Sequence, residues 1–201
     1  MDIKRKIFFI LLFISVSFGC GYARQQLEIT PPEILSGQAE HIQKEGLANF
    51  YKVSDILYRA EQPKTKGFKS LQEMGIRTVV NLREHHSDEK KMKGLGMQYV
   101  HIPVKTGKLN DKDVEQFLNV MADPDNYPVL VHCWHGADRT GTMVAVYRMV
   151  FDDYSREEAL AEMTGKTFGF HSVWKNLPEY IKNFDIEKWK GHAEDIKSGT
   201  K

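Results

Sequence analysis

The 201-residue chain is 41% hydrophobic and 27% charged, a composition that suits one folded domain with a sizeable core. Its 28 basic and 27 acidic residues give a net charge of +1, which excludes the broad basic field of a nucleic-acid-binding protein. Only two cysteines occur, Cys20 and Cys133, so Cys133 has no structural partner once Cys20 is processed.

The first twenty residues have the pattern of an export signal. Lys4, Arg5 and Lys6 precede an apolar run of about 12 residues, which is shorter than the roughly 20 residues of a membrane-spanning helix. We therefore expect residues 1–19 to be a signal peptide. Cys20 follows Gly19 in a pattern that resembles a bacterial lipobox, which makes Cys20 a candidate lipid anchor. A soluble secreted protein and an uncleaved anchor are the alternatives.

Removal of the signal peptide changes the charge balance and sets the expected domain organisation. Three basic residues and one acidic residue are lost, which leaves a net charge of −1. We expect a tether over residues 20–48, a catalytic domain over 49–187 and a frayed, charged tail over 188–201. The expected location is the cell envelope or periplasm.

The periodicity of apolar residues predicts strands that alternate with helices. The expected strands cover 49–53, 56–60, 76–82, 97–103 and 129–131. The expected helices cover 66–74, 87–93, 110–121, 143–150 and 155–163, and Pro178 makes residues 173–184 either two short helices or one kinked helix. This alternation predicts parallel βαβ units in an α/β sandwich. The charges of the 87–93 helix are expected on a solvated face. Arg83, Lys105 and Cys133 each follow a strand, so their loops should converge at one edge of the sheet.

The stretch from Val129 to Gly141 has the features of a phosphate site. A short apolar strand ends at His132, a tight loop follows, and an apolar helix begins after the loop. Backbone N–H groups of such a loop, together with the helix N-terminus, bind anions. Arg139 offers a planar fork of donors that matches two phosphate oxygens, and Cys133 lies where a thiolate nucleophile is favoured.

The sequence His-Cys-x5-Arg-Thr-Gly at residues 132–141 resembles the signature of the cysteine-dependent phosphatases, the protein tyrosine and dual-specificity superfamily. Residues 49–63 and 76–83 resemble an atypical dual-specificity branch found in bacteria, fungi and plants. The resemblance implies a three-layer sandwich, a phosphocysteine intermediate on Cys133 and help from Thr140 when the thiolate leaves. It also implies that the substrate phosphate is held by the loop residues Trp134, His135, Gly136, Ala137, Asp138 and Arg139.

The general acid is the part of the site that the sequence leaves open. Many relatives carry an aspartate after the strand that precedes the signature, whereas Lys105 or Thr106 stands there in this chain. Asp138 is the expected acid, because C-x-x-G-x-D-R-T resembles the loops of myotubularins and some bacterial lipid phosphatases. Asp111 and Asp113 are alternatives, although both are also suited to capping a helix.

We therefore expect a phosphatase that acts on phosphotyrosine, phosphoserine or phosphothreonine in proteins. A phosphoinositide or inositol-polyphosphate phosphatase is the alternative, and an inactive phosphate-binding module is a third reading. No cofactor and no metal are expected, because His85 and His86 have no third ligand at fitting spacing. A monomer is expected, with no nucleic-acid partner.

Overall fold

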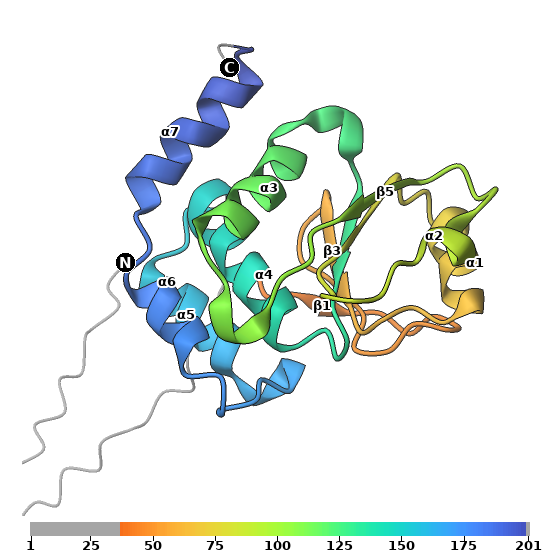
Figure 1. Cartoon of the computed structure of the whole chain (residues 1–201), viewed down its shortest axis with the longest axis horizontal. Coiled ribbons are helices and arrows are strands. Elements are labelled where there is room, and N and C mark those ends of the chain that lie inside the picture. Colours follow the sequence, from red (N-terminus) through yellow and green to blue (C-terminus); the bar gives the residue numbers. More distant parts are fainter. Residues whose placement is uncertain (1–36, 200–201) are drawn as a thin grey trace, which may run out of the picture. The chain divides into compact units, whose positions relative to one another are not determined.

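The computed structural model describes residues 37–199 (Figure 1). The expected signal peptide, the lipid anchor at Cys20 and most of the expected tether lie outside the described residues. The strands are β1 (Glu40–His41), β2 (Tyr51–Lys52), β3 (Leu57–Ala60), β4 (Thr78–Asn81), β5 (Gln98–His101) and β6 (Val129–His132). The α-helices are α1 (Thr65–Glu73), α2 (Glu89–Met92), α3 (Asp111–Ala122), α4 (Asp138–Phe151), α5 (Arg156–Thr164), α6 (Asn176–Lys182) and α7 (Ile186–Lys197). Short 3₁₀ helices are η1 (Thr106–Lys108), η2 (Pro124–Asn126) and η3 (Lys166–Phe168).

The strands form one mixed sheet in the order β1-β2-β3-β6-β4-β5. The four strands β3, β6, β4 and β5 are parallel, and β1 and β2 add an antiparallel edge. β6 is central, because it pairs with β3 on one side and with β4 on the other. The expected parallel βαβ units are therefore confirmed, and the strand that leads into Cys133 lies in the middle of the sheet.

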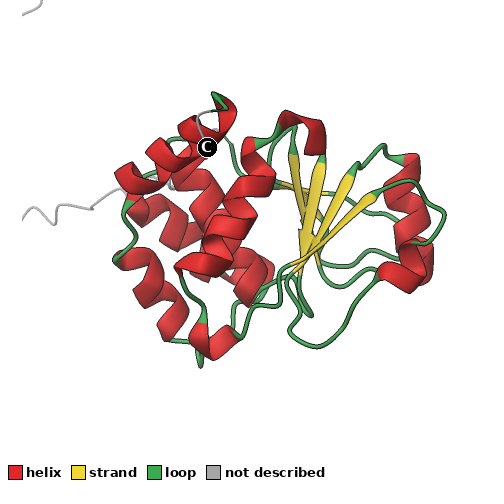
Figure 2. Cartoon of the chain, turned by 45° about the horizontal axis from the view of Figure 1, so that its top comes forward, coloured by secondary structure: helices red, strands yellow, loops and turns green. Residues whose placement is uncertain are grey.

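Two helical layers cover the two faces of this sheet. Figure 2 shows the yellow strands between a larger group of red helices on the left and a smaller group on the right. Side chains alternate between the two cores, so that in β6 Val131 packs towards α3 and α4 while Leu130 packs towards α1. The expected three-layer sandwich is confirmed. Full burial of β6 explains why this strand is a continuous apolar run rather than an alternating one.

Local signals in the sequence determine where several helices begin. Asn110 caps α3 and Ser155 caps α5, each in a capping box with the acidic residue three positions later. Each box satisfies backbone N–H groups that have no partner inside the helix. Pro178 lies in the first turn of α6, where its missing N–H costs little, so the segment forms one short helix.

The folded domain is longer than the sequence predicted at both ends. β1 begins at Glu40, within the expected tether, and α7 continues to Lys197, within the expected charged tail. The expectation of a frayed tail was wrong because Trp189 and Ala193, 4% and 3% exposed, lie one turn apart and pack into the core.

Buried Arg148, in the last turn of α4, holds the first described residues. It donates 3.0 Å to Glu162 of α5, 2.7 Å to Asp152 and 2.6 Å to the carbonyl of Gly37. Burial acts to lower the pKa of Arg148, but the negative charges of Glu162 and Asp152 outweigh it and raise this pKa. The start of the described chain is thus joined to the longest helix. Within residues 37–199, no helix is long and apolar enough to cross a membrane.

Candidate active site

The loop between β6 and α4 lies against the end of β3 at the carboxyl edge of the sheet (Figure 1). Gly136 has a φ of 68°, and a Cβ on it would lie 2.5 Å from backbone atoms of Ala60 and Glu61. Only glycine fits this close approach and this left-handed conformation. The loop is therefore shaped by contact with another strand, in addition to its own sequence.

Four successive carbonyls of the loop are bonded to groups around it. Those of Trp134, His135 and Gly136 accept hydrogen bonds from the backbone N–H of Gln62 at 3.1 Å, the Asn49 amide at 2.9 Å and Arg59 Nη2 at 2.8 Å. The carbonyl of Cys133 lies 3.1 Å from Nδ1 of His132. Because the carbonyls turn outward, the N–H groups of the loop face inward, which is the arrangement of an anion-binding nest.

Cys133 and Arg139 occupy the two ends of this loop. Cys133 is a free cysteine with 2% exposure. Arg139 Nη1 donates to the carbonyls of Leu82 at 3.1 Å and Val104 at 3.2 Å, which follow β4 and β5. The expected convergence of the loops after these strands is therefore seen in the contacts of Arg139.

Arg83 belongs to the same edge of the sheet, whereas Lys105 extends outward. Arg83 is 5% exposed, and its guanidinium carbon lies 4.4 Å from the ring centre of Trp134. Burial lowers the pKa of Arg83, with a smaller effect of Asp88 in the opposite direction. The Lys105 side chain is 60% exposed and lies 4.0 Å from Glu84.

A buried contact between Asp88 and His132 holds the end of β6, directly before the loop. Asp88 Oδ2 lies 3.1 Å from Nε2 of His132, and both side chains are fully buried. Asp88 also accepts hydrogen bonds from Asn81 at 2.9 Å and Gln62 at 3.1 Å. Burial acts to raise the pKa of Asp88, but the hydrogen bond and charge of His132 outweigh it and the pKa is lowered. An ionised Asp88 thereby fixes the imidazole beside Cys133.

The position of Asp88 corrects one expectation from the sequence. Residues 87–93 were expected to present their charges to solvent, yet Asp88 is 1% exposed. No local pattern distinguishes it from the charged residues that follow. Its partners come from three other segments, so its role depends on the tertiary fold.

Asp138 is the first residue of α4 and contacts a segment more than 30 positions away. Its Oδ1 accepts the backbone N–H of His171 at 2.8 Å, and its Oδ2 lies 2.9 Å from His171 Nδ1. Asp138 is 7% exposed, while the side chain of His171 is 48% exposed. His171 was not among the residues that the sequence indicated. The two side chains form an Asp–His pair at the rim of the loop.

Thr140 and His135 complete the set of expected loop residues. Thr140 is fully buried, and its hydroxyl has no hydrogen-bond partner among the described residues.

The ring of His135 lies 5.1 Å from that of His171. His135, Asp138 and His171 each offer a potential metal ligand, and these atoms lie within 4.8 Å of one another. Among the described residues of the site, this group has the donor atoms that could hold a metal ion. That the reaction needs no metal stays a prediction.

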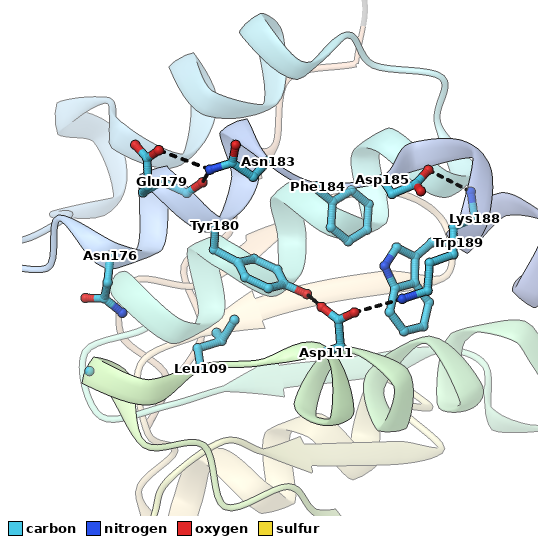
Figure 3. Close-up of a pocket in the computed structure, with 11 residues that line it drawn as sticks. Leu109, Asp111, Asn176, Glu179, Tyr180, Asn183, Phe184, Asp185, Lys188 and Trp189 are labelled. Carbon is cyan, nitrogen blue, oxygen red and sulfur yellow. Dashed lines mark hydrogen bonds and ion pairs between the residues drawn. The ribbon is translucent and has the colours of Figure 1, made fainter.

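Asp111 and Asp113 serve a different part of the structure. Asp111 accepts from Tyr180 at 2.8 Å and pairs with Lys188 at 2.8 Å, at the wall of a cavity of about 430 Å³ between α3, α6 and α7 (Figure 3). The hydrogen bond from Lys188 lowers the pKa of Asp111. Burial raises the pKa of Asp113, whose carboxylate is part of the α3 capping box. These contacts favour structural roles for both residues.

In this mostly parallel sheet, the central strand leads into a Cys-x5-Arg loop that ends at a helix N-terminus. This arrangement defines the class of cysteine-dependent phosphatases. The family model described as "DSP-PTPase phosphatase fused to NAD+ Kinase" matches residues 39–177, and the chain belongs to this family.

Individual relatives agree with this family. The chain is 30% identical over 141 residues to "Dual specificity protein phosphatase TpbA" of Pseudomonas aeruginosa strain UCBPP-PA14, a match that covers 69% of this chain and 64% of that protein. It is also 30% identical over 147 residues to "Inositol diphosphatase DSP3" of Arabidopsis thaliana, covering 69% and 71% of the two chains. The crystal structure of P. aeruginosa TpbA superposes with a TM-score of 0.70 at 25% identity, covering 80% of this chain and 98% of that one. The chain thus spans less than two thirds of the full length of TpbA.

Proposed function

We propose that this chain hydrolyses phosphate monoesters through a phosphocysteine intermediate. The observation that carries the proposal is the loop with four successive carbonyls bonded outward and with Cys133 and Arg139 at its ends. In the first step, Cys133 Sγ forms a bond to phosphorus while the bond from phosphorus to the leaving oxygen breaks. In the second step, water attacks phosphorus and releases inorganic phosphate and the thiolate. Arg139 and the inward N–H groups bind the phosphoryl oxygens in both steps.

Thr140 stabilises the thiolate as it leaves. Its hydroxyl is buried in the first turn of α4 and has no hydrogen-bond partner among residues 37–199, which supports a role towards Cys133. A buried hydroxyl without a partner is costly, so a hydrogen bond donated to the Cys133 thiolate during the reaction would compensate that cost.

Asp138 supplies the acid chemistry together with His171. The 2.9 Å contact between His171 Nδ1 and Asp138 Oδ2 supports a pair that holds one transferable proton, while the backbone N–H of His171 holds the carboxylate at 2.8 Å. The half-exposed imidazole gives that pair access to the leaving group. The proton passes to the leaving oxygen in the first step and is recovered from the attacking water in the second.

Phosphorylated proteins, including those with phosphotyrosine, are the proposed substrates. Trp134 is 52% exposed beside the nucleophile and is held from one side by Arg83, which supports an aromatic platform for a phosphotyrosine ring. A TpbA structure is titled as a complex with pTyr. Inositol phosphates are the second candidate, supported by the relative named as an inositol diphosphatase and by the cations Arg83 and Lys105 that follow β4 and β5.

Phosphate release from three substrates separates these possibilities. We expect turnover of p-nitrophenyl phosphate and a higher kcat/KM for a phosphotyrosine peptide than for an inositol polyphosphate. Trp134→Leu should lower kcat/KM for the peptide by about tenfold, the effect of losing one aromatic stacking contact, while Trp134→Phe retains most of it. A preference for the inositol polyphosphate would assign the site to the second candidate. No turnover of any of the three would leave an inactive phosphate-binding module.

We also propose that the protein is attached to the cell envelope through Cys20. The basic start, the apolar run and the Gly19–Cys20 step support this proposal. Cys20→Ala should move the protein from the detergent phase to the aqueous phase and abolish labelling with radioactive palmitate. Aqueous partitioning of the unmutated protein, with an N-terminus other than Cys20, would contradict an anchor.

A further inference from the structure

Arg59 is a fully buried cation directly beside the phosphate loop. It is 0% exposed, and only its Nη2 has a hydrogen-bond partner among the described residues, the carbonyl of Gly136 at 2.8 Å. Its Nε and Nη1 are buried without a partner in residues 37–199. A buried guanidinium is expensive unless a negative charge compensates it. We therefore expect negative charges to act on the Arg59 guanidinium.

The surroundings of Arg59 hold it in place, but no carboxylate among the described residues forms a direct ion pair with it. Its guanidinium carbon lies 3.8 Å from the centre of the Phe168 ring, and Gly141 allows the first turn of α4 to pass close to Nη2. The carboxylate that acts on it most strongly is Glu162, whose Oε2 already accepts from Arg148 at 3.0 Å. Burial lowers the pKa of Arg59 to about 10, so the side chain is charged at neutral pH.

After Glu162, the next negative charge that acts on Arg59 belongs to the phosphate loop. The second anionic group that acts on it is Cys133, and the Gly136 carbonyl that it binds belongs to the loop that would hold the phosphoryl group. By bonding that carbonyl, Arg59 also helps to turn the loop N–H groups inward.

We propose that Arg59 is a positioning residue that adds a positive charge, without a direct ion-pair partner among the described residues, to the phosphate loop and stabilises both the Cys133 thiolate and a bound phosphate. This proposal rests on the proposed phosphatase chemistry. The other charged groups around Cys133 are the Asp88–His132 pair below it, Arg83 and Arg139 beside it, and the Asp138–His171 pair at the rim. Two of these groups bring a carboxylate directly against an imidazole, whereas no carboxylate among the described residues contacts Arg59 directly.

Two substitutions separate charge from hydrogen bonding. Arg59→Gln removes the charge and keeps an amide that can donate to Gly136, whereas Arg59→Lys keeps the charge and loses the planar fork. The first measurement is the rate of Cys133 alkylation by iodoacetamide against pH, read by mass spectrometry in the full chain. The second is the dissociation constant of inorganic phosphate. Thermal unfolding establishes that each variant is folded.

In Arg59→Gln, we expect the midpoint of the alkylation profile to move about one pH unit upward and phosphate binding to weaken about tenfold, the equivalents of one pKa unit. Arg59→Lys should stay within about threefold of the unmutated chain in both measurements. Equal effects of Gln and Lys would show that hydrogen-bond geometry matters rather than charge, and an unchanged alkylation profile in Arg59→Gln would overturn the proposal. If Arg59→Gln does not fold, Arg59→Met provides the neutral variant.

Alkylation and phosphate binding do not require turnover. If the unmutated chain fails to hydrolyse any ester, the proposed function fails, yet these two measurements still test the effect of Arg59 on the loop.

Discussion

Cys133→Ser should abolish hydrolysis of p-nitrophenyl phosphate while leaving the fold unchanged. A serine hydroxyl does not ionise near neutral pH, whereas a cysteine thiol has an ordinary pKa of about 8.5 and yields the better nucleophile. The buried site accepts serine because the two side chains are similar in shape and Cys133 has no disulfide. Turnover and thermal unfolding of both proteins check this result.

Two further observations distinguish loss of the nucleophile from damage to the site. Cys133→Ser should still bind inorganic phosphate, because Arg139 and the loop N–H groups are unchanged. In the unmutated chain, rapid acid quenching should trap one phosphate on the peptide that contains Cys133, and vanadate should inhibit competitively. Comparable turnover by Cys133→Ser would exclude the phosphocysteine mechanism.

Asp138→Asn should slow the reaction by about 10²–10⁴ for substrates with poor leaving groups, the usual effect of losing a general acid. The loss should be large for an alkyl phosphate and smaller for p-nitrophenyl phosphate, whose leaving group needs little protonation. An acid works only while protonated, so its activity falls as the pH rises through its ionisation. Asp138→Asn should therefore flatten the basic limb of the pH–rate profile. His171→Gln should show the same leaving-group dependence, because His171 holds the Asp138 carboxylate.

Asp111→Asn is the matched control, because Asp111 is engaged by Tyr180 and Lys188 at the cavity beside α3. It should leave both the pH profile and the leaving-group dependence unchanged. If Asp111→Asn instead reproduces the acid pattern and Asp138→Asn slows every substrate equally, the acid lies on the other loop. Asp138 would then act by orienting Arg139.

The features of the fold that could be predicted are those encoded over short distances in the chain. The apolar run of β6, the glycine in the loop and the helix that follows are contiguous, so Cys133 and Arg139 could be found without a structure. The capping residues Asn110 and Ser155 were equally local signals. The helix periodicity of α7 was missed because its two buried positions, Trp189 and Ala193, are sparse among charged residues.

The supporting residues of the site could not be predicted, because each depends on a distant partner. Arg59 falls in a short strand that is buried on both faces, and a charged residue there gives no indication of the loop about 80 positions later. Asp88 is hidden in a charged run, and His171 is in a segment without periodicity. Only the tertiary fold brings these three side chains to the loop, from β3, from the start of α2 and from the segment before α6.

The hydrogen bond from Arg148 to the Gly37 carbonyl determines where a force applied to the preceding chain would reach the domain. A pull on the chain ahead of Gly37 would be transmitted through its carbonyl to the buried guanidinium, and from there to Glu162 and Asp152. That force would act on the last turn of α4, the helix whose first turn carries Arg139. Arg148 is bonded to both α5 and the C-terminal end of α4, two to three turns away from Arg139. A load applied at Gly37 would therefore reach α4 at the end opposite to the loop that carries Cys133 and Arg139.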